Sequence, residues 1–232
     1  TAAVRAARDE GIGEISIDLI FALPEALGRD WRRDLDAAVE LSPEHVSLYG
    51  LTIESRTPLG RWRDRGAVTE SPEERYEEEF LAAHERLSAA GFEHYEVSNY
   101  ALPGHRARHN SSYWRRVPYL GLGPSAHSFD GSRRSWNVAA YEEWVRRLAQ
   151  GEDPREGHED LAPGEIRAEE VYLGLRTREG LPSGPFPDVV SRWTGAGWAE
   201  VEAGRLRLTP SGWLRLDALA ADLTVSGSRY YI

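Results

Sequence analysis

Helical and strand-like segments alternate through the first hundred residues of this chain. Residues 1–10, 31–41 and 72–90 read as helices, and residues 15–23, 46–53 and 95–98 read as strands. The first strand is almost continuously apolar and ends at Pro24, which is typical of a strand covered on both faces. This order predicts an α/β fold with a parallel sheet or part of a (β/α) barrel. Because the order begins on a helix, we expect a further strand upstream, and hence half a barrel whose unpaired edges favour self-association.

The regular alternation stops at Asn99. Proline and glycine recur from residue 99 to residue 134, so we predict a long structured loop, and loops of this length are usually functional. A helix follows at residues 140–149, and the next charged stretch, with its glycine and proline, predicts a linker. Helices and a short hairpin that turns at Ala203-Gly204 then suggest a winged helix. We therefore expect three parts: the barrel part with its loop (1–150), the linker (151–163) and a small winged-helix-like C-terminal domain (164–232).

Composition excludes several classes of function. The chain has no cysteine among its 232 residues, so it forms no disulfide and ligates no iron–sulfur cluster by itself. No apolar run approaches the ~18 residues of a membrane span, and we expect a cytoplasmic protein. The formal net charge is −10, and the helix before the hairpin carries only Arg192 as a basic residue. These two features argue against a nucleic-acid partner for the winged-helix-like domain.

Asp18 stands inside the first apolar strand. Burial of a carboxylate is costly unless the group has a partner. One interpretation is a structural aspartate that accepts hydrogen bonds from the backbone or from an arginine. The other is a ligand contact near the carboxyl end of a barrel strand, where barrels of this kind place their sites. The strand alone does not decide between the two.

The segment from Val97 to Phe129 contains no acidic residue, although the chain as a whole is acidic. Its basic and aromatic side chains include Arg106, Arg108, Arg115, Arg116, Tyr100, Tyr113, Trp114 and Tyr119. Such a segment suits a flat anionic ligand, with guanidinium groups on carboxylates and rings on a π-system. The alternative is that these arginines pair with Glu54 or with residues 77–79. His105 and His109 suggest zinc only weakly because no third ligand is evident, whereas haem needs a single axial histidine.

Several motifs together resemble one family. They are DLIFALP at residues 18–24, HVSLYGLTIE at 45–54, YEVSNYA at 95–101, HNSSYW at 109–114 and YLGLGPSAHS at 119–128. In this order they resemble the oxygen-independent coproporphyrinogen III oxidases and their relatives, which are radical S-adenosylmethionine (radical SAM) proteins. The resemblance covers essentially the whole chain, and the HNxxYW pattern points to the haem-chaperone branch of the family.

The resemblance implies cofactors that this chain holds only in part. The family binds a [4Fe–4S] cluster through three cysteines, with S-adenosylmethionine on the remaining iron. Since those cysteines are absent here, we expect them upstream in the intact protein and no metal site in this chain other than haem. By resemblance, Asp18 contacts S-adenosylmethionine, and Thr52 and His127 align with positions that touch a second S-adenosylmethionine.

The acid-free segment and the family resemblance together suggest haem as a bound ligand. His109 is the possible ligand of the haem iron, and Asn110, Tyr113 and Trp114 would support the site. The resulting hypothesis is a haem chaperone that delivers haem to client haem proteins. The alternative is an enzyme that decarboxylates coproporphyrinogen III to protoporphyrinogen IX in porphyrin biosynthesis. Whether the chain is an enzyme, and in which oligomeric state it acts, stays open at this point.

Overall fold

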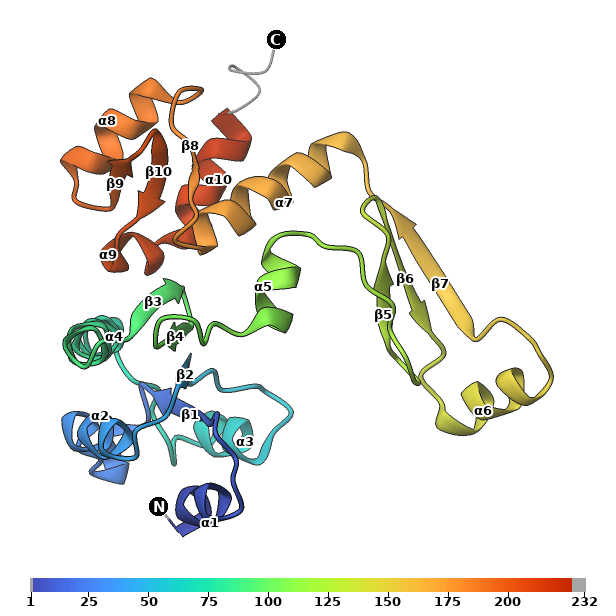
Figure 1. Cartoon of the computed structure of the whole chain (residues 1–232), viewed down its shortest axis with the longest axis horizontal. Helices are drawn as coiled ribbons and strands as arrows, with labels where there is room; N and C mark the ends of the chain where they lie inside the picture. The colour runs from blue at the N-terminus through green and yellow to red at the C-terminus, as the bar shows by residue number, and fades with distance from the viewer. Residues whose placement is uncertain (1, 227–232) are drawn as a thin grey trace.

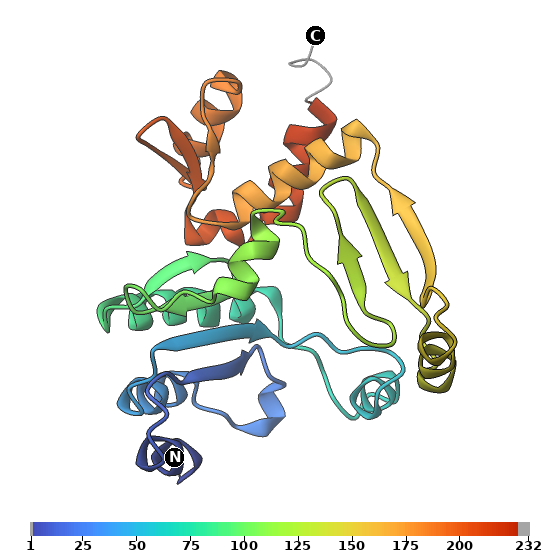
Figure 2. The same ribbon diagram turned by 45° about the vertical axis from the view of Figure 1, so that its right-hand side comes forward.

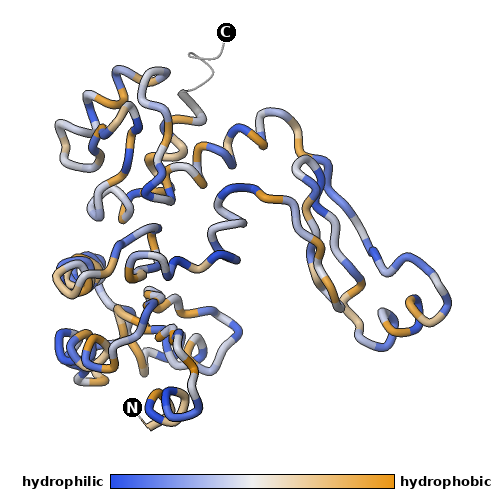
Figure 3. Tube along the Cα trace, in the orientation of Figure 1, coloured by the Kyte–Doolittle hydropathy of each residue, from blue (hydrophilic) through white to orange (hydrophobic). Residues whose placement is uncertain are grey.

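The computed structural model describes residues 2–226, in three parts (Figure 1). The N-terminal unit consists of α1 (Ala2–Asp9), β1 (Ser16–Phe21), a 3-10 turn (Glu25–Leu27), α2 (Trp31–Glu40), β2 (His45–Gly50), α3 (Pro58–Asp64), α4 (Glu73–Ala89), β3 (Glu93–Glu96) and β4 (Asn99–Ala101). Helices α2 and α4 alternate between hydrophobic and hydrophilic residues along their length (Figure 3). Their apolar sides pack on one face of the sheet, where Leu35, Phe80 and Leu87 join Phe21 and Val46 in the core.

The sheet of this unit has the strand order β1-β2-β4-β3. Strands β1 and β2 are parallel, as predicted, with Asp18 opposite Ser47. Strand β3 runs in the same direction as β1 and β2, but it is not their direct neighbour, because the unpredicted strand β4 lies between β2 and β3 and is antiparallel to both. The cause is a tight turn after β3, in which the Glu96 carboxylate accepts hydrogen bonds from the Ser98 N–H and the Asn99 side chain. The chain therefore reverses at once and returns beside β2.

Only one face of β1 is covered in the described chain. Phe21 is buried, whereas Ser16, Asp18 and Ile20 alternate with it and are exposed. Tyr49 of β2 lies on the same open side and is 47% exposed, as is Ile20. The expectation of a strand covered on both faces is therefore not met here, and the open face carries the Asp18 carboxylate.

The middle part contains α5 (Arg108–Trp114), β5 (His127–Phe129), β6 (Arg133–Asn137), α6 (Tyr141–Ala149) and β7 (Arg155–Asp160). The last four elements form an arm with the antiparallel sheet β5-β6-β7, which extends away from the other parts in Figure 1 and forms the right-hand side of the molecule in Figure 2. Two expectations are corrected. Residues 99–134, predicted as a loop, contain β4, α5 and β5, and the predicted linker (151–163) contains β7. Strand β7 is hydrophilic, and its pairing with β6 uses backbone groups that composition does not reveal.

The C-terminal part consists of α7 (Pro163–Arg176), β8 (Leu181–Pro182), α8 (Pro187–Gly195), β9 (Ala199–Glu202), β10 (Arg205–Leu208), α9 (Pro210–Trp213) and α10 (Leu216–Ser226). The predicted hairpin forms between β9 and β10, and both turn residues, Ala203 and Gly204, have the positive φ of a tight hairpin turn. Trp213 joins this part to the first: its ring meets His94 of β3, with centroids 4.3 Å apart. Residues 227–232 of the expected C-terminal domain lie outside the described residues. Among residues 2–226, no helix is long and apolar enough to cross a membrane.

Candidate functional site

Helix α5 is held at both ends by side chains from other elements. Before the helix, Arg106 pairs with Glu93 at 2.9 Å, and the Ala107 N–H donates a hydrogen bond to the Tyr95 hydroxyl at 3.3 Å. At its other end, the Arg176 guanidinium lies 4.1 Å from the centroid of the Trp114 ring. The short helix therefore has a fixed place between β3 and α7.

An aromatic row begins at His109 on α5. The His109 ring meets Tyr113 edge to face at 4.7 Å, Tyr113 meets Tyr119 at 4.9 Å, and Tyr119 lies 6.1 Å from Phe129 of β5. His109 itself is exposed in the first turn of the helix. An exposed imidazole supported by an aromatic ring leaves a nitrogen accessible to an axial ligand position on iron.

The four residues predicted for haem fall into two groups. His109 and Tyr113 contact each other, whereas Trp114 stacks under Arg176 of α7. Asn110 is half-buried beside them on the same helix. The histidine pair suggested for zinc does not form on one helix, because His105 precedes α5 and its Nδ1 lies 3.4 Å from Glu14. Within residues 2–226, no group of three histidine or acidic side chains is placed to hold a metal ion.

A cavity of about 360 Å³ lies between α5, α7 and the C-terminal part. Arginines from both sides line it, namely Arg106, Arg115, Arg116 and Arg205. Two of the four are neutralised by acids: Arg106 pairs with Glu93 and Arg116 with Glu169. The predicted pairing with acidic residues is thus confirmed for Arg106 and Arg116. The expected partners, Glu54 and residues 77–79, were wrong. Arg205, which binds backbone carbonyls, gave no signal in the sequence because its place in the cavity depends on tertiary structure.

Asp18 lies on the open face of the sheet and carries a charge that reaches His45 of β2. His45 is buried, and burial lowers its pKa, while the nearby Asp18 carboxylate raises that pKa to a smaller extent. The His45 ring forms hydrogen bonds with Ser16 and Tyr95, at 2.9 Å and 2.8 Å. His45 and Tyr95 were missed as site residues; the sequence signal was a histidine at the start of an apolar strand.

The three residues predicted for S-adenosylmethionine lie in three separate segments of the chain. Asp18 is in the middle of β1, Thr52 is exposed just after β2, and His127 begins β5 in the arm. The ring of His127 lies 5.9 Å from Trp136 of the neighbouring strand. No contact recorded among residues 2–226 joins the three to one another.

Glu96 of β3 has a structural partner in α7. Its side chain is fully buried, and its Oε2 lies 2.8 Å from Arg176 of α7. Burial raises the pKa of Glu96, and the positive charge of Arg176 opposes that shift. The pair connects β3 to α7, and Arg176 in turn covers Trp114 of α5. The buried pair therefore stabilises the position of α5, and the Glu96 carboxylate is not accessible to a substrate.

Comparison with known proteins identifies the family. The chain is 39% identical over 190 residues to the heme chaperone HemW of Synechocystis sp., covering 81% of this chain and 46% of that protein. It is 35% identical over 226 residues to the heme chaperone HemW of Mycobacterium tuberculosis, covering 96% and 58%. The chain belongs to the HemW family. It spans about half the length of these curated relatives, and no family model matches it.

The fold is similar to that of a solved structure, the coproporphyrinogen III oxidase HemN from Escherichia coli, which is described as a radical SAM enzyme. The TM-score is 0.66 at 16% identity, over 94% of this chain and 56% of that chain. This likeness confirms the predicted α/β fold. The resemblance stated from the sequence motifs is confirmed by the HemW relatives.

Proposed function

We propose that this chain is part of a haem chaperone, and that it binds haem through His109 on α5. The relatives named above are heme chaperones. The observation that carries the proposal is the exposed His109 imidazole, which Tyr113 supports at 4.7 Å on a helix anchored at both ends. A single accessible histidine meets the requirement of a haem iron for one axial ligand.

The surroundings of His109 fit the rest of a haem molecule. Tyr113 and Tyr119 offer apolar ring surface beside the imidazole. Arg108, in the first turn of α5, and Arg115, immediately after its last residue, form no ion pair in the described part of the chain, so their charges are available to propionates. Guanidinium groups bind carboxylates with two parallel hydrogen bonds, which favours them for such a ligand.

The iron–sulfur cluster does not fit this chain, because it contains no cysteine. In the proposal, the intact protein binds the cluster through residues outside this chain. S-adenosylmethionine would reach Asp18, whose exposed carboxylate on the open face of β1 has no recorded ion-pair partner in residues 2–226. Thr52 and His127 keep their proposed roles at a second S-adenosylmethionine. The haem chaperone would act in the cytoplasm and pass haem to client haem proteins.

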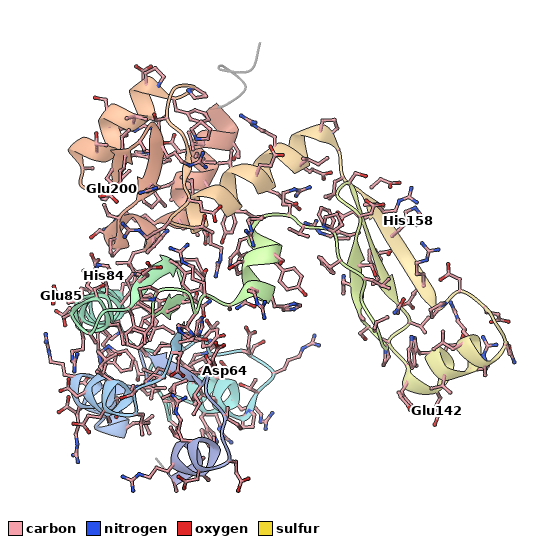
Figure 4. All side chains as sticks on the ribbon, in the orientation of Figure 1. Asp64, His84, Glu85, Glu142, His158 and Glu200 are labelled. Carbon is pink, nitrogen blue, oxygen red and sulfur yellow. The ribbon has the colours of Figure 1, made fainter. Side chains whose placement is uncertain are left out.

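A haem titration of this 232-residue chain tests the proposal. We expect one haem per chain with a shifted Soret band, and roughly tenfold or greater loss of affinity in His109→Ala. The control is His158→Ala, because His158 is an exposed histidine on β7, in the arm (Figure 4). Unchanged affinity and spectrum in His109→Ala would contradict the proposed site.

The fold likeness to HemN supports one alternative, the decarboxylation of coproporphyrinogen III. A longer protein that includes the cluster-binding residues separates the two functions. After cluster reconstitution, it is given S-adenosylmethionine, a reductant and coproporphyrinogen III. Formation of protoporphyrinogen IX and carbon dioxide would support the oxidase, whereas haem binding without turnover supports the chaperone.

A further inference from the structure

A chain of hydrogen bonds leads from β1 to the start of α5. The Ser16 hydroxyl lies 2.9 Å from His45 Nδ1, and His45 Nε2 lies 2.8 Å from the Tyr95 hydroxyl. That hydroxyl accepts the Ala107 N–H at 3.3 Å, and Ala107 is the residue immediately before α5. In Figure 2 the helix stands beside the ends of β3 and β4. These hydrogen bonds therefore join the sheet to the helix that carries His109.

One arrangement of protons satisfies every group in this series of hydrogen bonds. The Ala107 N–H can only donate, so the Tyr95 oxygen accepts it. The Tyr95 O–H is then free to donate to His45 Nε2, and the Nδ1–H of His45 donates to Ser16. Burial supports this arrangement, because it keeps His45 neutral by lowering its pKa and Tyr95 protonated by raising its pKa. The hydroxyl of Tyr95 therefore has a defined direction.

The other contacts before α5 are weaker anchors. The His105–Glu14 and Arg106–Glu93 pairs are half-exposed or exposed, and ion pairs of that kind contribute little. Ala107, at the N-cap, has no side chain that can accept a hydrogen bond from the first turn. Tyr95, in contrast, is 4% exposed, so water does not compete for its hydrogen bonds.

We propose that Tyr95, oriented by His45, is a positioning residue that fixes the first turn of α5 and with it His109. The haem part of this inference rests on the proposed function, whereas the placement of α5 does not. Tyr95 would act on haem only through Ala107 and the helix, because its hydroxyl is engaged within the protein.

Two substitutions remove the same hydrogen bond from opposite ends. Tyr95→Phe deletes the acceptor and keeps the ring, which packs under Arg106. Ala107→Pro deletes the donor, and the φ of −60° at Ala107 is one that proline adopts without strain. Tyr141→Phe is the control, because Tyr141 is 67% exposed on α6. Each variant and the Tyr95→Phe/Ala107→Pro double variant are compared by haem affinity, Soret spectrum and hydrogen exchange of residues 105–115.

We expect either single variant to weaken haem binding roughly two- to tenfold, as the loss of one buried hydrogen bond would. The double variant should lose no more than the larger single loss, because both changes break one bond. Exchange in α5 should accelerate in Tyr95→Phe while exchange in α4 stays unchanged. If Tyr95→Phe fails to fold, Ala107→Pro decides alone, since it leaves the sheet intact.

Additive losses in the double variant, or unchanged exchange of α5 in Tyr95→Phe, would overturn the inference. Faster exchange of α5 with unchanged haem affinity would confirm that Tyr95 positions the helix and would contradict the haem site instead. The two proposals can therefore fail separately.

Discussion

His84 of α4 and His94 of β3 face each other through their Nδ1 atoms, which lie 3.0 Å apart. His94 Nε2 lies 3.3 Å from the Val97 carbonyl, so its proton is on Nε2 and its Nδ1 accepts the Nδ1–H of His84. The His94 ring also stacks on Tyr100 at 3.9 Å and meets Trp213 of the C-terminal part. Figure 4 shows His84 on α4 beside Glu85. This hydrogen bond requires a neutral His94, because a proton on His94 Nδ1 would remove the acceptor.

Acid should therefore destabilise the contact between the N-terminal and C-terminal parts. Burial lowers the pKa of His84, and the positive charge of Arg178 lowers it further. Burial also holds the pKa of His94 well below its ordinary value of 6.5, with smaller lowering contributions from His84 and Arg178. Below pH 6.5 the histidines of the unfolded chain bind protons, whereas the buried histidines of the folded chain do not. The contribution of the neutral histidines to folding stability is therefore complete above pH 6.5 and is lost as the pH falls. Each histidine contributes a slope of at most about 1.4 kcal/mol per pH unit, which is reached only between its folded and unfolded pKa values.

Thermal melts between pH 7.5 and pH 5 measure this slope. His94→Phe keeps the ring but cannot titrate, so its melting temperature should fall less steeply with acid than that of the wild type. His158→Gln, on the exposed strand β7, should leave the slope unchanged. Equal slopes in all three proteins would show that the histidine pair does not set the acid sensitivity.

Removal of Arg176 should destabilise the protein strongly. Its partner Glu96 is fully buried, and burial already raises the pKa of this carboxyl. Loss of one member of a buried ion pair typically costs about 3–5 kcal/mol, because the other charge is left without compensation. Urea unfolding of Arg176→Met should show a loss of this size, and Glu96→Gln in the same chain should restore part of it.

The matched control for Arg176→Met is Arg133→Met. Arg133 pairs with Asp160 on the surface of the arm, where solvent screens the interaction, and its loss should leave unfolding unchanged. Arg176→Met should also accelerate hydrogen exchange at the end of α5, since it removes the cation above Trp114. Similar unfolding curves for the two arginine variants would contradict the structural role of the buried pair.

The charge of Asp18 should be measurable at His45. The carboxylate raises the pKa of His45 against the larger lowering effect of burial, so Asp18→Asn should lower that pKa further. Titration of the His45 ring protons by NMR gives the shift directly. The ring protons of His158, in the arm, show whether the substitution acts locally. An increase or no change in the pKa of His45 would mean that Asp18 does not face this ring.

The sequence predicts those parts of the fold that depend on local patterns. Strands β1 and β2 and helices α2 and α4 follow from apolar periodicity, and the hairpin follows from Ala203-Gly204. The sequence does not reveal strand β4, because the strand has only three residues. It follows a turn that is held by a hydrogen bond from the Ser98 N–H to the Glu96 side chain. Strand β7 is missed because its residues are hydrophilic, so no apolar pattern marks its pairing with β6.

In the candidate site, too, the sequence predicts local contacts but not tertiary ones. The contact of His109 with Tyr113 follows from their spacing of four residues on a helix. The stacking of Arg176 on Trp114 joins segments that are distant in sequence, so no periodicity reveals it. The bond from Ala107 to Tyr95 likewise uses a backbone donor that no residue type marks. The motifs therefore indicate which residues matter, and the tertiary structure shows what holds them.

Gly121 should be intolerant of a side chain. A Cβ at this position would lie 2.1 Å from the His127 carbonyl oxygen, and the Gly121 N–H donates to the Ser128 hydroxyl at 2.9 Å. Gly121→Ala must therefore push residues 119–121 away from β5, with a cost of about 1–3 kcal/mol. Gly164→Ala is the control, because that glycine has open space in the first turn of α7 and should gain about 0.5–1 kcal/mol as alanine. Limited proteolysis of the arm measures the difference: Gly121→Ala should be cleaved faster than the wild type and Gly164→Ala should not, and equal cleavage rates would show that the arm accommodates the methyl group.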